Sequence, residues 1–478
     1  MDFGYRKLYI GGNLCDAATN RKQSVLCPAT EETIAEIAWA TPADTQKALE
    51  CAAEGFKYWS RLSLKDRTNW MNLLRDAVAA KETLLRECVM YEMGKPWEAT
   101  EDDFKTVMDA LQWYPEEMKR MRDEMIPDEE NTHSHRITSQ PAGVAVAILA
   151  WNFPLLNLGF KLGPALAAGC SIIIKPSEYS PLSAYVFGEI CADIDFPAGV
   201  INILCGPVEE TGVLLCQSKI PQVITMIGSS ATGRKLIAQS ATSIKRMSME
   251  LGGNAPVLVF NDADIEKAAS DIAALKFGNC GQICVSPNRI FVHKDVYIQF
   301  RDLLIGKAQK IKIGFGKEQQ PTMGPLISDK ARRRVAEIID EAVSKGAQVM
   351  AGGKAPESLK SGYFFEPTVL NGVQPDMRAY KEEVFGPVAS LLTFEDETDV
   401  LKKANDTDAG LVAYVYSENM DRIQRLSADL EFGEVQINGF KYAIYLPHGG
   451  IKESGIGKDC SQYALDDYLI KKRVSVQL

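Results

Sequence analysis

The spacing of hydrophobic residues changes along the chain from a helical period to an alternation of strands and helices. Between Pro42 and Arg122, apolar residues recur at steps of three and four, which predicts a layer of helices. Thr41 followed by Pro42 is typical of a helix start, because proline fits the first helical turn. Residues 1–40 contain short extended segments separated by turns and predict an arm or hairpin.

From Ile137 onward, short apolar segments alternate with helices of ten or more residues. This alternation predicts a doubly wound parallel sheet with helices on both faces, followed by a second α/β domain that reaches about residue 440. The tail from Asp466 to Val476 alternates and predicts a strand added to another sheet, with a neighbouring subunit's sheet as one candidate. The strands of the alternation are expected at 144–151, 171–175, 200–204, 222–227, 255–260 and 289–293.

Polar residues follow several of these strands. Parallel sheets bind ligands beyond the carboxyl ends of their strands, and Asn152, Lys175 and Gly228 each lie just past such an end. The segment from Gly228 to Gly233 can hold a phosphate against helix N–H groups, although a plain strand-to-helix turn is the commoner use of such a sequence. In a dinucleotide site, Glu178 would accept from both ribose hydroxyls and repel a 2′-phosphate, which favours NAD over NADP.

Composition excludes several classes of partner. The chain has 478 residues and a net charge of −10 with no run of basic residues, so neither a nucleic acid nor an anionic membrane is an expected partner. The N-terminus does not resemble a signal peptide. Eleven cysteines without CxxC pairs indicate reduced thiols in a cytoplasmic protein. Only four histidines are present, so we expect neither a zinc cluster nor a histidine-based triad.

Cys284 and Glu250 are the candidates for chemistry. Cys284 lies in a tight segment between a predicted helix and a predicted strand, and a thiolate attacks a carbonyl once its pKa is lowered. Glu250 stands between Met249 and Leu251, and apolar neighbours raise a carboxyl pKa toward that of a general base. Ten other cysteines compete for the role, and a surface glutamate at a strand end is the plain alternative for Glu250. Cys280 is either a core thiol or the partner of Cys284 in an oxidative lock.

Joined in order, the motifs resemble the NAD(P)-dependent aldehyde dehydrogenase superfamily, nearest its succinate-semialdehyde branch. The resemblance implies an NAD-binding domain from 1–118 and 139–250, a catalytic domain at 251–440, and an oligomerisation flap from 119–138 with 441–478. It also implies a homodimer or homotetramer. The matching blocks are residues 151–155 (WNFPL), 163–169 (GPALAAG), 175–178 (KPSE), 228–233 (GSSATG), 250–253 (ELGG), 281–284 (GQIC), 383–387 (EVFGP) and 449–457 (GGIKESGIG).

The resemblance also implies roles for individual residues. Cys284 would be the nucleophile that forms a thiohemiacetal with the aldehyde and then a thioester, and Glu250 would activate the water that releases the acid. The side-chain amide of Asn152 would hold the oxyanion together with the Cys284 backbone N–H. No metal ligand is expected. The residues expected to bind NAD are Trp151, Lys175, Ser177, Glu178, Gly228, Ser229, Gly233, Leu251, Glu383 and Phe385.

The sequence departs from the succinate-semialdehyde branch at its substrate site. That branch grips the substrate carboxylate with two arginines and a serine, and the matching positions here are Phe160, Gly278 and Tyr442. We therefore expect a different aldehyde and a mainly apolar tunnel. Lys441 and His448 are close enough in sequence to supply another anion contact. The residues expected to line the tunnel are Asn157, Phe160, Ile283, Val285 and Tyr442.

These expectations describe an NAD-dependent enzyme that oxidises a small aldehyde to its carboxylic acid, with NADP as the alternative cofactor. Relatives that pass the thioester to coenzyme A lack the base, so Glu250 favours hydrolysis. One alternative is a non-phosphorylating dehydrogenase of a phosphorylated, sulfonated or carboxylated semialdehyde. The alternative from another class is a catalytically retired, NAD-binding structural relative, against which the intact Asn152, Glu250 and Cys284 argue.

Overall fold

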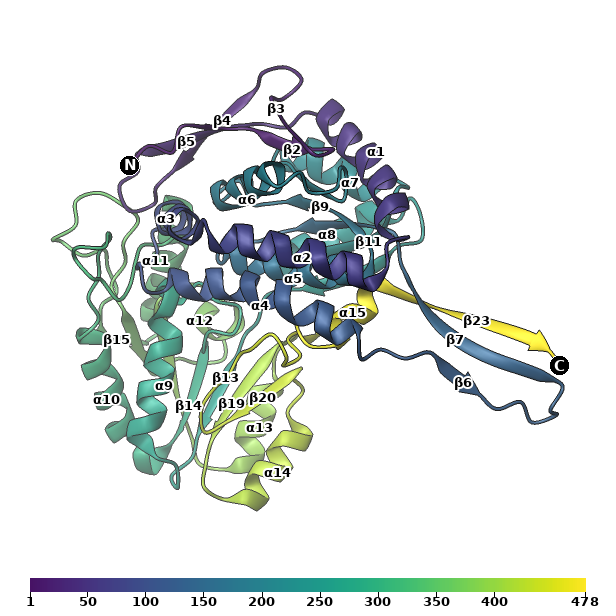
Figure 1. Cartoon of the computed structure of the whole chain (residues 1–478). Coiled ribbons are helices and arrows are strands. Elements are labelled where there is room, and N and C mark those ends of the chain that lie inside the picture. Colours follow the sequence, from purple (N-terminus) through teal and green to yellow (C-terminus); the bar gives the residue numbers. More distant parts are fainter.

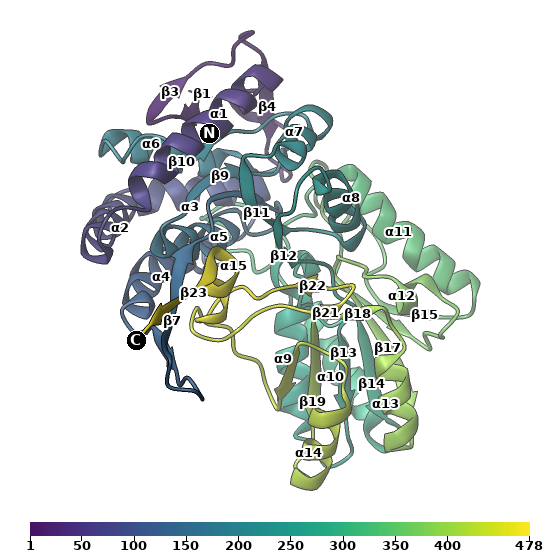
Figure 2. The same ribbon diagram turned by 90° about the vertical axis from the view of Figure 1, so that its right-hand side faces the viewer.

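Two sheets, each with its own hydrophobic core, form the framework of the molecule (Figure 1). The computed structural model describes all 478 residues. The first core gathers residues mainly from the N-terminal half as far as Leu251, and the second runs from Ala255 to Phe432. We call the part of the molecule built around the first core the first body and the part built around the second core the second body. In the view of Figure 2 the first body lies above the second, with β12 near their junction. The mixed α/β fold with parallel sheets agrees with the predicted class.

The N-terminal region forms a small sheet, where the sequence predicted an arm or hairpin, and then the predicted helical layer. Thr41 caps α1 in a capping box with Asp44, and Pro42 occupies the first helical position. The small sheet consists of β1 (Tyr5–Arg6), β4 (Lys22–Leu26) and β5 (Thr33–Ala38). The helices are α1 (Pro42–Trp59), α2 (Leu64–Ala79), α3 (Glu82–Met93) and α4 (Thr100–Met118).

The first large sheet has the strand order β22-β12-β11-β8-β9-β10-β2-β3. Strands β8 to β12 run parallel, whereas β22, β2 and β3 add antiparallel edges. The chain passes from β8 outward to β10, then returns to place β11 on the other side of β8. The strand order therefore reverses between β8 and β11, where doubly wound sheets bind their ligands. The strands are β2 (Leu8–Ile10), β3 (Asn13–Cys15), β8 (Val144–Ile148), β9 (Ser171–Lys175), β10 (Ile201–Ile203), β11 (Pro221–Ile227), β12 (Arg246–Glu250) and β22 (Gly455–Ile456).

Helices connect these parallel strands as the alternation predicts. None of the helices in the molecule combines the length and apolar composition that crossing a bilayer requires. The connecting helices are α5 (Pro154–Ala168), α6 (Leu182–Asp193), α7 (Val213–Gln217), which follows a π-helical turn at Val208–Gly212, and α8 (Ser230–Ser240).

The second large sheet has the order β15-β16-β17-β14-β13-β19-β20, and all its neighbours are parallel except β15 and β16. Its strands are β13 (Pro256–Val259), β14 (Arg289–His293), β15 (Gln348–Ala351), β16 (Thr368–Asn371), β17 (Val388–Phe394), β19 (Val412–Tyr416) and β20 (Glu434–Ile437). Its helices are α9 (Ile265–Phe277), α10 (Tyr297–Gln309), α11 (Asp329–Ser344), α12 (Arg378–Lys381), α13 (Glu397–Asn405) and α14 (Met420–Asp429). Short strands β18 (Ala409–Gly410) and β21 (Ile451–Lys452) pair separately.

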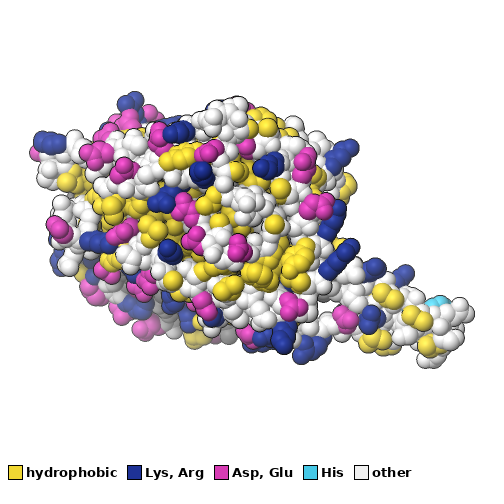
Figure 3. Space-filling model, turned by 45° about the horizontal axis from the view of Figure 1, so that its top comes forward, with side chains coloured by type: hydrophobic (Ala, Val, Ile, Leu, Met, Phe, Trp, Pro, Cys, Tyr) yellow, Lys and Arg dark blue, Asp and Glu magenta, His cyan; other side chains and the backbone are white.

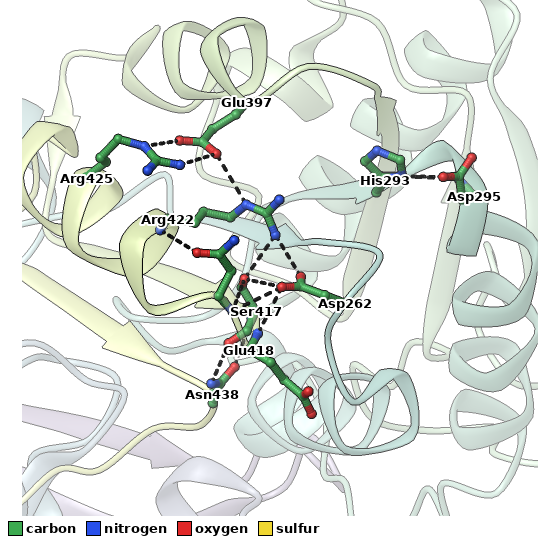
Figure 4. Close-up of polar contacts among 10 residues, drawn as sticks. Asp262, His293, Asp295, Glu397, Ser417, Glu418, Arg422, Arg425 and Asn438 are labelled. Carbon is green, nitrogen blue, oxygen red and sulfur yellow. Dashed lines mark hydrogen bonds and ion pairs between the residues drawn. The ribbon is translucent and has the colours of Figure 1, made fainter.

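Arg422 fastens α14 to the rest of the second body (Figure 4). Its guanidinium donates to Asp262 at 2.8 Å and to Glu397 at 3.2 Å. It also donates to the hydroxyl of Ser417 at 3.1 Å. Because the Arg422 side chain is only 20% exposed, this network holds the end of the sheet more firmly than surface pairs would.

A three-stranded arm stands away from the body (Figures 1 and 3). Its order is β23-β7-β6, and β23 pairs with β7 from Leu469 to Gln477. The predicted tail strand therefore joins a sheet of its own chain. Its first residues differ from the prediction, because 466–468 end the helix α15 (Tyr463–Tyr468). The strands are β6 (Glu124–Ile126), β7 (His133–Pro141) and β23 (Leu469–Gln477).

Candidate active site

A cavity of about 1220 Å³ lies between the two large bodies. Its walls come from α4, the segments after β8 and β11, the end of β12, the loop before β14, the loop after α12, and most of residues 433–448 with 459–460. The carboxyl ends of β8 and β11 reach this cavity, so it opens at the switch point of the first sheet, the place between β8 and β11 where the strand order reverses.

The loop that carries Cys284 has an unusual backbone. Asn279 and Cys280 adopt left-handed conformations, with φ of 46° and 57°. Gly281 also has a positive φ, and a Cβ at that position would lie 2.1 Å from the Gly386 carbonyl oxygen. Only glycine therefore fits at 281, and the close approach of the two backbones holds the loop in place.

Buried polar contacts complete the support of this loop. The Gln282 amide donates to the Asn279 carbonyl at 3.0 Å and accepts from the Ile327 N–H at 2.9 Å. On the other side, a Cβ at Gly253 would lie 2.6 Å from the carbonyl oxygen of Cys284. The glycines after Glu250 thus allow the nucleophile loop to approach the end of β12.

Cys284 and Glu250 meet in this cavity, with His448 between them. The Cys284 Sγ lies 4.0 Å from His448 Nε2, and that nitrogen lies 3.3 Å from Glu250 Oε1. Nδ1 of His448 lies 2.7 Å from Glu434 Oε1. Glu250 is 4% exposed, and its Oε1 has no hydrogen bond. A thiol, an imidazole and two carboxylates therefore form one contiguous buried cluster.

The protonation states in this cluster depend on burial and on neighbouring charges. Burial and the adjacent Glu250 carboxylate raise the pKa of the Cys284 thiol to about 12. Burial alone would lower the pKa of His448, but its contacts with Cys284, Glu250 and Glu434 raise it well above its usual value. Without bound ligands, the cluster therefore contains a neutral thiol beside an imidazolium.

Asn152 is held against the Cys284 loop. Its side-chain nitrogen donates to the Gln282 carbonyl at 3.1 Å, and its side-chain oxygen accepts from Asn157 at 3.4 Å. The Asn279 side chain donates to the Asn152 carbonyl at 3.1 Å. These contacts fix the Asn152 amide beside the loop that carries Cys284.

Half of the expected cofactor residues line the cavity. They are Trp151, Gly228, Ser229, Glu383 and Phe385. The other half, Lys175, Ser177, Glu178, Gly233 and Leu251, lie outside its walls. Lys175 ends β9 as a buried residue, whereas Glu178 is exposed.

The local geometry at these positions fits a dinucleotide. Ser229 caps α8 by accepting from the Thr232 N–H, so the positive end of this helix faces the switch point. Glu383 accepts from the Gly253 N–H at 3.1 Å, and a Cβ at Gly252 would lie 2.5 Å from its carboxylate. Burial raises the pKa of Glu383 to about 7.

Two pairs of apolar contacts support the same region. The Phe385 and Trp151 rings meet edge-on, with their centroids 5.5 Å apart. Leu251 packs against Gly233, where a Cβ would lie 2.8 Å from the Leu251 side chain.

The expected tunnel residues all line the cavity: Asn157, Phe160, Ile283, Val285 and Tyr442. The Tyr442 hydroxyl lies 2.8 Å from that of Tyr414, which donates to the Val285 carbonyl at 2.7 Å. The Phe160 ring lies 6.2 Å from the His448 ring. This wall is therefore mainly apolar, with one amide and a phenol pair at its edge.

The two suggested anion contacts differ in their surroundings. Lys441 is exposed, and its ammonium lies 5.7 Å from the Tyr445 ring. His448 lies between Glu250 and Glu434, which offset its positive charge. Of the three positions where the resemblance led us to expect that anion contacts are missing, Phe160 and Tyr442 line the cavity, and Gly278 lies beside Ile283.

Two features of the site had no signal in the sequence. Glu434 lies on β20 in no recognisable motif, yet it orients His448. Lys161 lies in the apolar helix α5 and pairs with Asp459 at 2.5 Å beneath the cavity. The sequence singled out His448 only as an anion contact and did not predict its position between Cys284 and Glu250.

The chain is similar in sequence to known proteins. The sequence profile of the aldehyde dehydrogenase family matches residues 15–474. The mitochondrial succinate-semialdehyde dehydrogenase of Oryza sativa is 39% identical over 97% of this chain and 88% of its own length. The NADP(+) succinate-semialdehyde dehydrogenase of Escherichia coli is 38% identical over 98% of this chain and 97% of its own length.

A solved structure extends the comparison to the fold. The succinate-semialdehyde dehydrogenase of Burkholderia pseudomallei superposes with a TM-score of 0.97 at 38% identity, covering 99% of this chain and 98% of the other. The predicted aldehyde dehydrogenase fold and the assignment as an oxidoreductase are confirmed. The chain belongs to the aldehyde dehydrogenase family.

Proposed function

We propose that this protein oxidises a small aldehyde to its carboxylic acid with NAD, using Cys284 as nucleophile and Glu250 as general base. The proposal rests mainly on the position of Cys284 beside Glu250 in one cluster. The Cys284 Sγ and a Glu250 carboxylate oxygen lie within 4.8 Å of each other. A thiol and a carboxylate this close can act in turn on one bound carbonyl carbon.

The chemistry follows from these positions. The Cys284 thiol releases its proton to solvent, its sulfur bonds to the aldehyde carbon, and the carbonyl electron pair moves to oxygen. Asn152 and the Cys284 backbone N–H stabilise that oxyanion. Bound NAD would supply the hydride acceptor that converts the thiohemiacetal to a thioester. Glu250 then takes a proton from water, whose oxygen attacks the thioester carbon; the C–S bond breaks and the acid leaves.

The preference for NAD rests on Glu178. Its exposed carboxylate lies beyond the end of β9, where it would accept from the ribose hydroxyls and repel a 2′-phosphate. The E. coli relative carries NADP(+) in its name, so cofactor preference varies among related chains. Lys175, which ends β9, would bind the same ribose.

We also propose a role for each domain of the chain. Residues 1–118 with 139–250 would bind the cofactor, and 251–440 would supply the nucleophile. The arm would join subunits into a dimer or tetramer, because it exposes Met125 (60%) and Val476 (57%). Only 469–477 of the C-terminal segment belong to this arm, since the residues before them return to the cavity wall and the first sheet.

The eleven free cysteines support a reducing compartment such as the cytoplasm.

The mainly apolar lining favours an uncharged aldehyde over a semialdehyde. The competing substrate class consists of carboxylated, phosphorylated or sulfonated aldehydes. The names of the relatives support that class, since they include succinate-semialdehyde and 3-sulfolactaldehyde dehydrogenases.

The test is NAD(P)H formation with propanal, benzaldehyde, succinate semialdehyde, lactaldehyde and glyceraldehyde 3-phosphate. Each is run with NAD and with NADP, beside the Cys284→Ala variant. We expect turnover that Cys284→Ala abolishes, with uncharged aldehydes ranked first. Turnover that survives in Cys284→Ala would refute the proposed nucleophile, and an anionic aldehyde ranked first would refute the proposed substrate class.

A further inference from the structure

Three side chains at the bottom of the cavity have the identities and spacing of zinc ligands. Cys284 Sγ, His448 Nε2 and a Glu250 carboxylate oxygen all lie within 4.8 Å of one another. Zn²⁺ binds such atoms at about 2.0–2.3 Å, which places tetrahedral ligands about 3.3–3.7 Å apart. The 3.3 Å between Nε2 and Glu250 Oε1 already matches, and the 4.0 Å between Sγ and Nε2 exceeds it by a few tenths of an ångström.

The outer contacts of His448 are those of a metal ligand. A zinc-bound histidine usually donates its second ring N–H to a carboxylate, which fixes the tautomer and directs the other nitrogen at the metal. Here Nδ1 lies 2.7 Å from Glu434 Oε1, and the same oxygen accepts from the Gly449 N–H at 3.2 Å. Glu434 is thereby held in place, and Nε2 faces Cys284 and Glu250.

Glu250 supplies an independent observation. It is 4% exposed, and its Oε1 takes part in no hydrogen bond. Buried carboxylate oxygens normally accept hydrogen bonds, so one that is in charge contact with the His448 ring but has no hydrogen bond retains lone pairs for a ligand. This oxygen is the one that lies 3.3 Å from His448 Nε2.

Charge balance also favours a divalent ion. On binding, the Cys284 thiol and the His448 imidazolium would each release one proton to solvent, so that sulfur binds as a thiolate and the imidazole as a neutral ligand. One thiolate and one carboxylate would then neutralise Zn²⁺ within the buried site. The fourth position would face the cavity, where a water molecule can complete the tetrahedron.

We propose that Cys284, His448 and Glu250 form a binding site for Zn²⁺, and that the bound ion switches the enzyme off reversibly. The inhibition rests on the proposed function, because the ion would occupy both the nucleophile and the base. The metal site itself does not depend on that function. It requires only the three side chains and the positioning residue Glu434.

The test uses the full-length, chelator-treated protein without cofactor. Co²⁺ is titrated in and followed by its thiolate charge-transfer absorption, and Zn²⁺ is then added to displace it. We expect one displaceable ion per chain. Cys284→Ala should remove the charge-transfer band, and His448→Phe should weaken binding at least tenfold. Glu434→Gln should weaken it about 10–100-fold through the orientation of His448. His135→Phe, on the arm, should bind as the wild type does.

Folding of each variant is checked by circular dichroism, and Glu250→Gln serves as a second ligand variant. A band that persists in Cys284→Ala, or affinity unchanged in both His448→Phe and Glu250→Gln, would overturn the site. A separate assay measures aldehyde oxidation with Zn²⁺ and then with chelator. Inhibition that the chelator reverses supports the switch, and full activity with one zinc bound per chain overturns it. An enzyme inactive with every aldehyde would count against the proposed function, while cobalt binding would still decide the site.

Discussion

The ammonium of Lys161 lies 2.5 Å from the Asp459 carboxylate, and both side chains are buried. Lys161 belongs to α5, which also supplies Asn157 and Phe160 to the cavity. Asp459 exchanges two backbone hydrogen bonds with His448, of 2.7 and 2.8 Å. The ion pair therefore joins the helix beneath the cavity to the segment that presents the imidazole.

Removing one partner of this pair should destabilise the protein strongly. An uncompensated buried charge costs about 3–5 kcal/mol, so Lys161→Met should lower the free energy of unfolding by about that amount. The double variant Lys161→Met/Asp459→Leu should lose less than Lys161→Met. Urea unfolding followed by fluorescence measures both. The exposed pair of Lys354 and Glu357 is the control, and Lys354→Met should leave the unfolding midpoint unchanged. Equal losses in the single and double variants would contradict a coupled pair.

Asn152→Ala should slow the chemical step more than it weakens substrate binding. Loss of one oxyanion donor typically lowers kcat by about 10²–10³-fold. KM for the aldehyde should change much less, because the donor acts on charge that develops in the transition state. Steady-state kinetics measures both constants, with Asn405→Ala on α13 as the control. A raised KM with unchanged kcat would assign Asn152 to substrate binding instead.

Glu178→Ala should relax cofactor preference. Removing the carboxylate removes its repulsion of the 2′-phosphate and its bonds to the ribose hydroxyls. We expect kcat/KM for NADP relative to NAD to rise about tenfold, which is 1.4 kcal/mol. Glu129→Ala, on the segment between β6 and β7, is a charge-matched control. An unchanged ratio would show that Glu178 does not contact the ribose.

Cofactor affinity should depend on pH through Glu383. Burial raises the pKa of this carboxyl to about 7, so it is ionised above that pH and protonated below it. The ionised form is the better acceptor for ribose hydroxyls, so KM for NAD should rise several-fold as pH falls from about 8 to about 6. Glu383→Gln should have a higher KM that varies less over this range. Parallel pH profiles for the wild type and the variant would rule out this role.

The elements that the sequence predicted best are those whose signal is local. β9 and β14 have the predicted bounds, because apolar runs end there at clear turns. Thr41 and Pro42 likewise mark the start of α1 with a capping box. The end of α15 was missed, because Tyr468 continues the alternating pattern of β23 although it is still helical.

The parts of the site that the sequence did not predict depend on distant contacts. The sequence could pair Glu250 with Cys284 because each lies in a recognised motif, at 250–253 and 281–284. The position of His448 depends on Glu434 from β20 and on backbone pairing with Asp459, and neither contact has a local signature. The pairing of Lys161 with Asp459 could not be predicted either, because an ion pair between residues nearly 300 positions apart leaves no periodic pattern in the sequence.

Rapid mixing of Glu250→Gln with NAD and a good aldehyde tests most directly whether Cys284 forms a thioester that water activated by Glu250 hydrolyses. We expect a burst of about one NADH per active site, followed by turnover about 10²–10⁴-fold slower than that of the wild type. Acid quenching after the burst should yield Cys284 carrying an acyl group, visible by mass spectrometry. Wild-type turnover without acylated Cys284, or loss of the burst itself in folded Glu250→Gln, would contradict the assignment.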